Sequence, residues 1–382
     1  MEIEITDTLL DIPATQWNKL NKDGNPFTSH AFLTALEESK SIGGETGWIP
    51  RYLLLWDNNG NLAGALPMYE KHHSWGEYVF DWAWANAWQQ YGLAYYPKLV
   101  VAVPFSPVTG HRFLISMDNN REDIIYYIHA AAVVYAKKEG YSSLHYLFPT
   151  STECNLLKQQ GVLIRHDVQF QWQNCSYADF KGFLATMTSR KRKKIARERR
   201  RVLEKGIEFR TISGEQLSSI NMERMYEFYL CTIMRHGSQA YLSREFFLML
   251  AERMADNIVL IEAHLQGKVV AAALNIRHDK ILYGRYWGAV EEYHSLHFET
   301  CYYQAISYCI RNGLSRFEGG AQGEHKLSRG FLPVITCSAH WMANKRLTPA
   351  ISDFLKREKA QVEHYQHLLS EHSPFRNDPI RN

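Results

Sequence analysis

The feature that most constrains the fold is a pattern that occurs twice along the chain. The sequences RYLLLWDNNGNLAGALPMYEK (51–71) and IVLIEAHLQGKVVAAALNIRHD (258–279) each hold an apolar run, a turn with glycine and a second run of small apolar residues. This pattern is typical of a β-hairpin. Gly60 and Gly267 occupy equivalent places, 267 − 60 = 207 positions apart. We predict a tandem repeat of one unit, with chance similarity of two β-patterns as the alternative.

The sequence around each hairpin extends the repeat. An aromatic run follows each one, EYVFDWAWA from position 77 and ILYGRYWGA from position 281, and predicts a further strand. Apolar residues three and four apart precede each one, in SHAFLTALEES (29–39) and REFFLMLAERM (244–254), and predict a helix. The expected fold class is therefore α/β (α+β), with two tandem units whose mixed sheets are flanked by helices.

The length of the chain agrees with two such units. It has 382 residues, and about 150 residues per domain is usual. We predict a first unit at 1–168, a second unit at 169–346 and a C-terminal helix and tail at 347–382.

The second unit ends in a segment placed for binding. LHFETCYYQAISYCIRNG (296–313) has the spacing of a long helix that stops at Asn312 and Gly313. LSRFEGG then predicts a short strand that ends at Glu318, so RFEGGAQGEHKLSRGFLP (316–333) follows a strand–helix–strand unit. Ligands bind at the carboxyl edge of the strands in open α/β sheets. We interpret this segment as a site rather than a simple turn.

Composition narrows the class of protein. Apolar residues make up 46% and charged residues 22%, which is typical of a globular protein with buried cores. The N-terminus has no signal-peptide pattern, and no apolar run reaches the ~18 residues of a membrane span, so we expect a cytoplasmic protein. The six cysteines show no CxxC spacing, which predicts reduced thiols rather than a zinc site or a disulfide framework.

Several longer strings carry a family resemblance. They are NPFTSHAFLTALEES (25–39), YYPKLVVAVPFSPVTGHR (95–112), KRKKIARERRRV (191–202), LYGRYWGA (282–289), HFETCYYQAI (297–306) and FEGGAQGEHKLSRGF (317–331). Together with the doubled unit, they resemble the FemAB-like proteins, whose fold is two copies of the GNAT N-acyltransferase fold. The most similar subgroup is described as predicted peptidoglycan biosynthesis or N-acyltransferase proteins.

The resemblance implies both a fold and a reaction. It implies two tandem GNAT-like units and an N-acyltransferase that moves an acyl or aminoacyl group onto an amine, with a cell-wall precursor as one candidate acceptor. It further implies acyl-CoA or aminoacyl-tRNA as the donor substrate.

Such a reaction needs a base for the amine and donors for the oxyanion. Glu318 ends the last strand just before Gly319 and Gly320, and such a strand end directs a side chain into the cleft. Glu299 lies in the first turn of the long helix among aromatic residues, where burial would raise its pKa. Either carboxylate is a candidate base. The alternatives are a Glu318 that pairs with an arginine and a Glu299 that only favours the helix N-terminus.

The loop after Glu318 supplies further candidates. Other FemAB-like enzymes carry a glycine-rich segment with a lysine at the corresponding place, so the resemblance implies that Lys326 binds or polarises the donor. His325 is a candidate proton shuttle, because an unperturbed histidine has a pKa near about 6.5. A solvated polar loop is the alternative. We predict as substrate-binding residues Arg285, Trp287, Tyr302, Gln322, Gly323, Glu324 and Arg329.

A cofactor signature is present only as a short string. GNAT enzymes that use acyl-CoA usually show Q/R-x-x-G-x-G/A where a helix N-terminus takes the pyrophosphate. In the second unit Arg285 and Gly288 are followed by Val290, which departs from that pattern. In the first unit the pattern is matched, and the candidate cofactor-binding residues are Gln89, Gly92 and Ala94.

A metal site is not expected. The sequence HSLHFE places His294, His297 and Glu299 close together, with His325 further along the chain. Their spacing is not that of H-E-x-x-H, so we predict no bound metal.

The positive charge of the chain is concentrated in one segment. Residues 190–201, RKRKKIARERRR, hold nine basic groups and one acid, a local charge of +8 in a chain of net +3. Positions 190–205 fit a helix with Ile195 and Val202 as an apolar stripe and Gly206 at its end. One expectation is an anionic partner, which could be RNA phosphates, anionic lipid headgroups or a lipid-linked diphosphate precursor. The alternative is a solvated helix between domains.

Two other functions stay open at this point. One is an acyl-CoA-dependent acetyltransferase of small amines. The other is a non-catalytic protein that binds a cell-wall precursor or nucleic acid through the basic helix. The tRNA-donor hypothesis is weakened, because residues 206–222 are too few for the helical-hairpin arm that aminoacyl-tRNA-dependent FemAB enzymes often carry.

Overall fold

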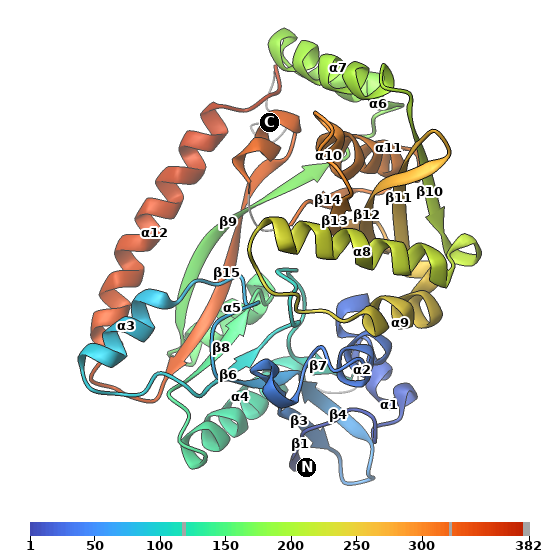
Figure 1. Ribbon diagram of the computed structural model, residues 1–382. Coiled ribbons are helices and arrows are strands. Elements are labelled where there is room, and N and C mark those ends of the chain that lie inside the picture. Colours follow the sequence, from blue (N-terminus) through green and yellow to red (C-terminus); the bar gives the residue numbers. More distant parts are fainter. Residues whose placement is uncertain (117–119, 321–322, 377–382) are drawn as a thin grey trace. The chain divides into compact units, whose positions relative to one another are not determined.

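The computed structural model describes residues 1–116, 120–320 and 323–376 (Figure 1). The chain divides into two compact units. Unit 1 consists of Met1–Asp167 and Ile335–Glu363, and unit 2 consists of Val168–Val334 and the segment from His364 onward. We predicted from the sequence that domains end after residues 168 and 346. Whether the chain folds as separate domains with these boundaries stays a prediction.

The repeated hairpin is present in both units. In unit 1, β3 (Tyr52–Trp56) pairs antiparallel with β4 (Leu62–Leu66), and in unit 2, β11 (Ile258–Leu265) pairs antiparallel with β12 (Lys268–His278). The equivalent glycines have almost the same backbone angle, with φ at +77° for Gly60 and +78° for Gly267. A residue with a Cβ rarely adopts this left-handed conformation. The predicted repeat of the hairpin is therefore confirmed.

Unit 1 contains two sets of paired strands together with helices. The first set has the order β1-β3-β4-β7, with β1 at Glu2–Thr6 and β7 at Leu114–Ile115. The second set has the order β8-β6-β5-β2, which are Ser143–Leu147, Lys98–Val101, Met68–Lys71 and Trp48–Pro50. The helices are α1 (Ala14–Leu20), α2 (His30–Glu38), α3 (Trp82–Gln90), α4 (Arg121–Lys138) and α5 (Ser151–Gln159), with 3-10 turns η1 (Pro26–Thr28) and η2 (Gly44–Thr46).

The core of unit 1 joins both strand sets to α4 and α5. Ile124 and Ile128 of α4 and Leu157 of α5 are buried in one cluster with Leu53 of β3 and Leu144 of β8. Burial of such aliphatic side chains is the main favourable term in folding.

Unit 2 is built on one run of paired strands in the order β10-β11-β12-β13-β14-β9. Here β10 is Ile207–Ser213, β13 is Ile281–Ala289, β14 is Arg316–Glu318, and β9 is Leu163–Gln173, which pairs with β14 through Gln171–Gln173. The β13–β14 pair is parallel, and the other pairs that the structure gives for this run are antiparallel.

Helices flank the strands of unit 2. They are α6 (Phe180–Thr186), α7 (Ser189–Leu203), α8 (Ser219–Arg235), α9 (Arg244–Met254), α10 (Leu296–Phe298) and α11 (Gln304–Arg311), with short turns η3 (Gly214–Gln216), η4 (Ala255–Asn257) and η6 (Glu324–Arg329). Between α10 and α11, residues Glu299–Tyr303 form a π-helical segment, η5. A Cβ at Gly288 of β13 would lie 1.8 Å from the carbonyl oxygen of Phe228 in α8, so only glycine permits this helix to pack on the strand.

Three elements contain residues of both units. They are β9, β15 (Leu332–Met342) and α12 (Thr348–Glu371). Within unit 1, residues Ser338–Met342 of β15 pair antiparallel with β8. In the described part of the chain, no helix combines the length and the apolar character needed to cross a bilayer.

Most predicted elements are confirmed. The predicted helices coincide with α2, α7, α9 and α12, and the long helix stops at Asn312, with Gly313 at φ +61°. The predicted strands coincide with β13 and β14. The fold class, α/β with mixed sheets flanked by helices, is likewise confirmed.

One predicted strand is wrong. The aromatic run from Glu77 leads into helix α3 instead of forming a strand. Trp84 and Trp88 lie four residues apart, so both fall on one helical face and are buried beside Leu347 and Ile351. This burial outweighs the β-preference of the aromatic residues.

The expectation of reduced thiols without a disulfide is also wrong. Cys154 of α5 and Cys337 of β15, 183 positions apart and both in unit 1, form a disulfide. Spacing rules detect only cysteines that are close in sequence, so this pair gave no signal. The free cysteines are Cys175, Cys231, Cys301 and Cys309.

Candidate active site

The candidate site lies in unit 2, where β13 and β14 part. Their parallel pairing ends at Tyr283 and Glu318, while β13 continues to Ala289. The chain leaves β14 through Gly319 and Gly320, and Gly320 has φ +84°, a conformation suited to glycine. Glu318 is thus the last residue before two strands diverge at a carboxyl edge.

Glu318 is a buried carboxylate, 5% exposed. Its Oε1 lies 3.1 Å from Nη2 of Arg316. Burial raises the pKa of Glu318 to about 7, while the charges of Arg316 and Arg285 act in the opposite direction. A carboxyl group with that pKa exchanges a proton readily near neutral pH, as a general base must.

Lys326 approaches the same strand end from η6. Its side chain is buried, and its Nζ donates a hydrogen bond to the carbonyl oxygen of Gly320 at 2.8 Å. A Cβ at Gly319 would lie 3.5 Å from Cδ and Cε of Lys326 and 3.0 Å from Cε1 of Phe331, so the glycine leaves room for both side chains. Burial lowers the pKa of Lys326 to about 8.

A cluster of rings lies beside η6. The Nε2 of His325 is 3.1 Å from the hydroxyl of Tyr302, and the ring of Tyr302 packs on Phe331 at 5.3 Å. His297 contacts Tyr302 and Trp287, at 5.4 and 5.3 Å between ring centroids. This arrangement brings together three of the residues predicted from the sequence, Trp287, Tyr302 and His325.

The rings of this cluster are largely uncharged at neutral pH. Burial lowers the pKa of His297 to about 4. Burial also lowers the pKa of His325, helped by the charges of Arg329 and Lys326, and burial raises the pKa of Tyr302. A neutral His325 keeps one nitrogen that can accept a proton, as its predicted role requires.

Glu299 is engaged inside the fold. It opens the π-helical segment η5, a feature that often occurs at functional sites. Its carboxylate accepts hydrogen bonds from Nε of Arg199 at 3.1 and 3.2 Å and from the amide of Gln304 at 2.8 Å. These contacts favour the structural alternative for Glu299, and its role as a base stays a prediction.

Arg329 has a similar internal position. Its guanidinium donates to Glu198 at 3.0 and 3.1 Å and to the carbonyl oxygen of His325 at 2.7 Å, and it lies over the ring of Phe298. Tyr303 donates to the same Glu198 carboxylate. The structure therefore gives Arg329 a role in holding η6 against α7, and substrate binding by Arg329 stays a prediction.

The reasoning from sequence missed Glu198 and Arg199, because it treated the basic run as one charged surface. A signal was present: Glu198 is the single acid of the run, three residues after Ile195 and four before Val202. That spacing places it on the buried apolar stripe of α7.

The other predicted loop residues have different surroundings. Gln322 lies outside the described residues. Gly323 has φ +115°, and a Cβ there would lie 2.5 Å from the ring of His325. Glu324 accepts a hydrogen bond from the hydroxyl of Tyr365 at 2.6 Å. Arg285 lies in β13 with its guanidinium 5.4 Å from the ring of Tyr286, and it acts on the pKa of Glu318.

The outward face of α7 is strongly basic. A hollow on this face is lined by Arg190, Lys191, Lys193, Lys194, Ala196, Arg197 and Arg200. The Nζ of Lys191 donates to Oγ of Ser328 in η6 at 3.1 Å. The basic face is thus joined directly to the loop that carries Lys326.

The candidate cofactor residues lie in unit 1. Gln89 is in the last turn of α3, Gly92 follows at φ +68°, and Ala94 leads towards β6. The next helix in the described chain, α4, begins only at Arg121. The local structure therefore lacks the helix N-terminus that this motif needs for a pyrophosphate, and donor binding by these residues stays a prediction that it does not favour.

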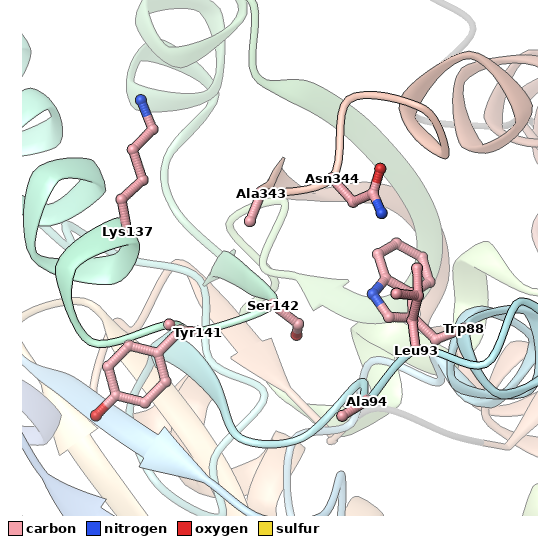
Figure 2. Close-up of a pocket in the computed structure, with 9 residues that line it drawn as sticks. Trp88, Leu93, Ala94, Lys137, Tyr141, Ser142, Ala343 and Asn344 are labelled. Carbon is pink, nitrogen blue, oxygen red and sulfur yellow. The ribbon is translucent and has the colours of Figure 1, made fainter.

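Ala94 lines a separate pocket of unit 1, of about 270 Å³. Figure 2 shows Trp88, Leu93, Lys137, Ser142 and Asn344 around this pocket. Its walls come from α3, α4 and the segments beside β8 and β15.

Within the described ranges, no three His, Cys, Asp or Glu side chains are grouped so that they could hold a metal ion. Of the four residues considered for a metal, His294 bonds to Ser295 and Arg201, and Glu299 to Arg199.

Comparison with known proteins gives a family and a fold. Residues 8–377 match the family model FemAB_like, described as peptidoglycan biosynthesis/recognition. No curated protein sequence matches the chain.

Three similar solved structures share the fold over almost their whole length. The crystal structure of FemX has a TM-score of 0.54 and 12% identity, with 92% of this chain and 100% of that chain covered. The structure of L-PGS from Bacillus licheniformis has a TM-score of 0.54 and 10% identity, covering 91% and 96%. The C-terminal domain of a putative lysylphosphatidylglycerol synthetase from Agrobacterium fabrum has a TM-score of 0.53 and 8% identity, covering 91% and 96%.

Proposed function

Because the chain belongs to the FemAB-like family and is a transferase of acyl or aminoacyl groups, we propose that it transfers such a group onto an amine in unit 2. One observation carries this proposal. A buried carboxyl group with a pKa of about 7, Glu318, ends the strand at which β13 and β14 diverge. A buried lysine with a lowered pKa lies against the glycines that follow it.

In the proposed reaction, Glu318 is the base. Its carboxylate takes a proton from the acceptor amine, and the amine nitrogen then attacks the donor carbonyl carbon. A new C–N bond forms, and the bond from that carbon to the leaving group breaks. The leaving group, a thiol or a ribose hydroxyl, departs with a proton. Near neutral pH a group with a pKa of about 7 is partly ionised, so it can both accept and return a proton.

Lys326 stabilises the oxyanion in this proposal. Its ammonium group, together with the backbone N–H groups of Gly319 and Gly320, faces the negative charge that develops on the donor carbonyl oxygen. The hydrogen bond from Nζ to the carbonyl of Gly320 holds the ammonium at the strand end before the donor arrives.

The substrates follow from the family and from charge. The family description supports a peptidoglycan precursor as acceptor. As donor we keep acyl-CoA or aminoacyl-tRNA, as the family resemblance in the sequence implies. All of these candidates carry phosphate groups. The basic face of α7 offers cations to such groups, and Lys191 links this face to the loop of Lys326. The proposal keeps the cytoplasmic location expected from the sequence.

A thermal-shift titration tests this proposal. The purified chain is titrated with acetyl-CoA, a long-chain acyl-CoA, aminoacyl-tRNA and a UDP-linked muramyl peptide, because a ligand of the native state raises the melting temperature. We expect a shift with one donor and one acceptor. That pair is then assayed for transfer with the wild-type protein and with Glu318→Gln and Lys326→Met.

The outcome separates the alternatives. Transfer by the wild type that both variants lose supports the proposal. A shift with acetyl-CoA and transfer to small amines alone indicates the small-amine acetyltransferase. Ligand binding without transfer, removed by high salt, contradicts the proposal and indicates a binder that acts through α7.

A further inference from the structure

Unit 1 exposes a concentrated group of aromatic side chains on the segment of residues 74–97, which includes α3 (Figure 1). Trp75 is 54% exposed, Phe80 50%, Trp82 43% and Tyr91 69%, and the aliphatic Leu93 is 39% exposed. Two further aromatic residues, Tyr127 and Tyr365, are exposed to this degree in the rest of the described chain. Exposed apolar side chains gathered in this way mark interaction surfaces.

The same segment exposes no charge. Its 24 residues include only two charged ones, Glu77 and Asp81, and both are buried, at 3% each. The exposed polar side chains of α3 are the neutral Asn86, Gln89 and Gln90. The segment itself therefore adds aromatic and neutral polar side chains to the surface, and no charge.

The two buried acids hold the segment in place from inside. Lys98 of β6, itself fully buried, donates to Glu77 at 2.9 Å, to Asp81 and to the hydroxyl of Ser74 at 2.9 Å. The hydroxyl of Tyr95 donates to the same Asp81 carboxylate. A buried ion cluster costs desolvation energy, which the hydrogen bonds among these groups offset. The same bonds fix the segment to β6 from inside.

The helix α3 separates an inner from an outer set of rings. Trp84 and Trp88 face the core of unit 1, whereas Trp82 faces outward and packs on Trp75, with ring centroids 5.8 Å apart and ring planes at 75°. An edge-to-face pair does not form the flat platform on which a sugar chain stacks. It does present two amphipathic indole rings, each with an apolar body and one N–H donor.

We propose that Trp75, Phe80, Trp82, Tyr91 and Leu93 form a surface that docks on the interface of a lipid bilayer. Trp and Tyr prefer the headgroup level of a membrane, where their rings enter the acyl boundary and their polar groups stay hydrated. Phe and Leu side chains enter the acyl boundary beside them. A surface without charges enters this region without stripping ions of water. The docking surface is independent of the proposed transferase chemistry, since it involves none of the candidate residues in unit 2.

The test uses the full chain and vesicles of pure phosphatidylcholine, which carry no net charge. Co-sedimentation is measured at low salt and at about 1 M salt, where the Debye length of about 3 Å removes attraction through the basic α7. The wild type sediments with the vesicles at both salt concentrations. The variant Trp75→Ser/Phe80→Ser/Trp82→Ser shows a partition coefficient at least about tenfold lower.

A matched control keeps the result specific. Tyr127→Ser/Val134→Ser replaces two side chains that are 44% and 65% exposed on α4 of the same unit, and it sediments like the wild type. Melting temperatures of both variants verify that they are folded. As a second readout, lipids brominated near the headgroup quench part of the tryptophan fluorescence of the wild type and less of that of the triple variant.

Three outcomes would overturn the proposal. The wild type stays in the supernatant with neutral vesicles at high salt. The control variant loses binding as much as the triple variant does. Or light scattering shows that the wild type self-associates through this segment and does not bind vesicles, which would make a second copy of the chain its partner.

Discussion

Arg329 of η6 donates hydrogen bonds to both carboxylate oxygens of Glu198 in α7, at 3.0 and 3.1 Å, and both side chains are buried. The same guanidinium donates to the carbonyl oxygen of His325, next to Lys326. This ion pair therefore connects the basic helix to the loop of the candidate site.

Replacing Arg329 by methionine leaves Glu198 buried without its cation. We expect a loss of about 3 to 5 kcal/mol in the free energy of unfolding, the usual cost of breaking one side of a buried pair. Urea unfolding measures it. The double variant Glu198→Met/Arg329→Met recovers much of that loss, because no uncompensated charge remains.

A control for this pair lies on the same helix. Arg200 and Glu204 form an ion pair at 3.7 Å whose side chains are 69% and 66% exposed. Glu204→Gln should cost less than about 1 kcal/mol. Equal losses in Glu204→Gln and Arg329→Met would show that burial of the Arg329 pair does not matter.

Glu299→Gln separates the two candidate bases. Its partner Arg199 loses a charged acceptor, so the free energy of unfolding falls by about 1 to 3 kcal/mol. Turnover per folded molecule stays within a few-fold of the wild type, because Glu318 is the base in the proposed reaction. A turnover loss of about a hundredfold with unchanged stability would make Glu299 the base instead.

Lys326 makes stability depend on alkaline pH. Its pKa is about 8 in the folded state, below the 10.5 of an exposed lysine, so between these values the unfolded chain binds more protons. The free energy of unfolding of the wild type therefore rises from pH 8 to 10.5 relative to Lys326→Met, by up to about 3 kcal/mol. Below pH 8 the difference in the free energy of unfolding between the two proteins is constant.

Urea unfolding of both proteins at several pH values measures this difference. Lys356→Met serves as the control, because that side chain is 75% exposed and its replacement leaves the difference flat. If the free energy of unfolding changed with pH in the same way in the wild type and in Lys326→Met, the lowered pKa of Lys326 would be contradicted.

The disulfide between Cys154 and Cys337 should stabilise the oxidised protein. The two cysteines are 183 positions apart, so the bond closes a long loop. Removal of such a bond typically lowers the free energy of unfolding by about 2 to 5 kcal/mol. A reducing agent should lower the melting temperature of the wild type and of Cys231→Ala, but not that of Cys154→Ala/Cys337→Ala. An unchanged melting temperature of the wild type on reduction would contradict the bond.

The parts of the fold that the sequence predicts are those with local signals. The predicted helix at Arg244–Met254 and the predicted strand at Ile281–Ala289 form over their predicted ranges. In each case the periodicity of the sequence agrees with the burial of the side chains. The sequence pattern predicts that Gly60 and Gly267 occupy equivalent turns of the two hairpins. Their nearly equal φ angles confirm this prediction. The run that contains Trp84 predicts a strand, because its composition favours β-structure. Burial of Trp84 beside Leu347 and Ile351 decides for a helix instead.

The residues of the candidate site could be predicted from the sequence, but their interaction partners could not. Glu318 and Lys326 were chosen from a strand end and a glycine-rich loop, and the structure brings both to Gly319 and Gly320. The partner of Glu299 lies a hundred positions away in the basic run, where spacing carries no information about pairing. For the same reason Cys154 could not be matched with Cys337, nor Lys98 with its two acids.

The role of Glu318 as the base of acyl or aminoacyl transfer can be measured from the pH dependence of kcat/KM. The assay uses the donor and the acceptor found by thermal shift. The wild type should show a rising limb near pH 7 from Glu318 and a falling limb near pH 8 from Lys326. Glu318→Gln should lower kcat/KM by at least about a hundredfold and abolish the rising limb, at an unchanged fold, while the exposed control Glu292→Gln keeps both limbs. A folded Glu318→Gln variant with wild-type turnover and an unchanged rising limb would contradict the account.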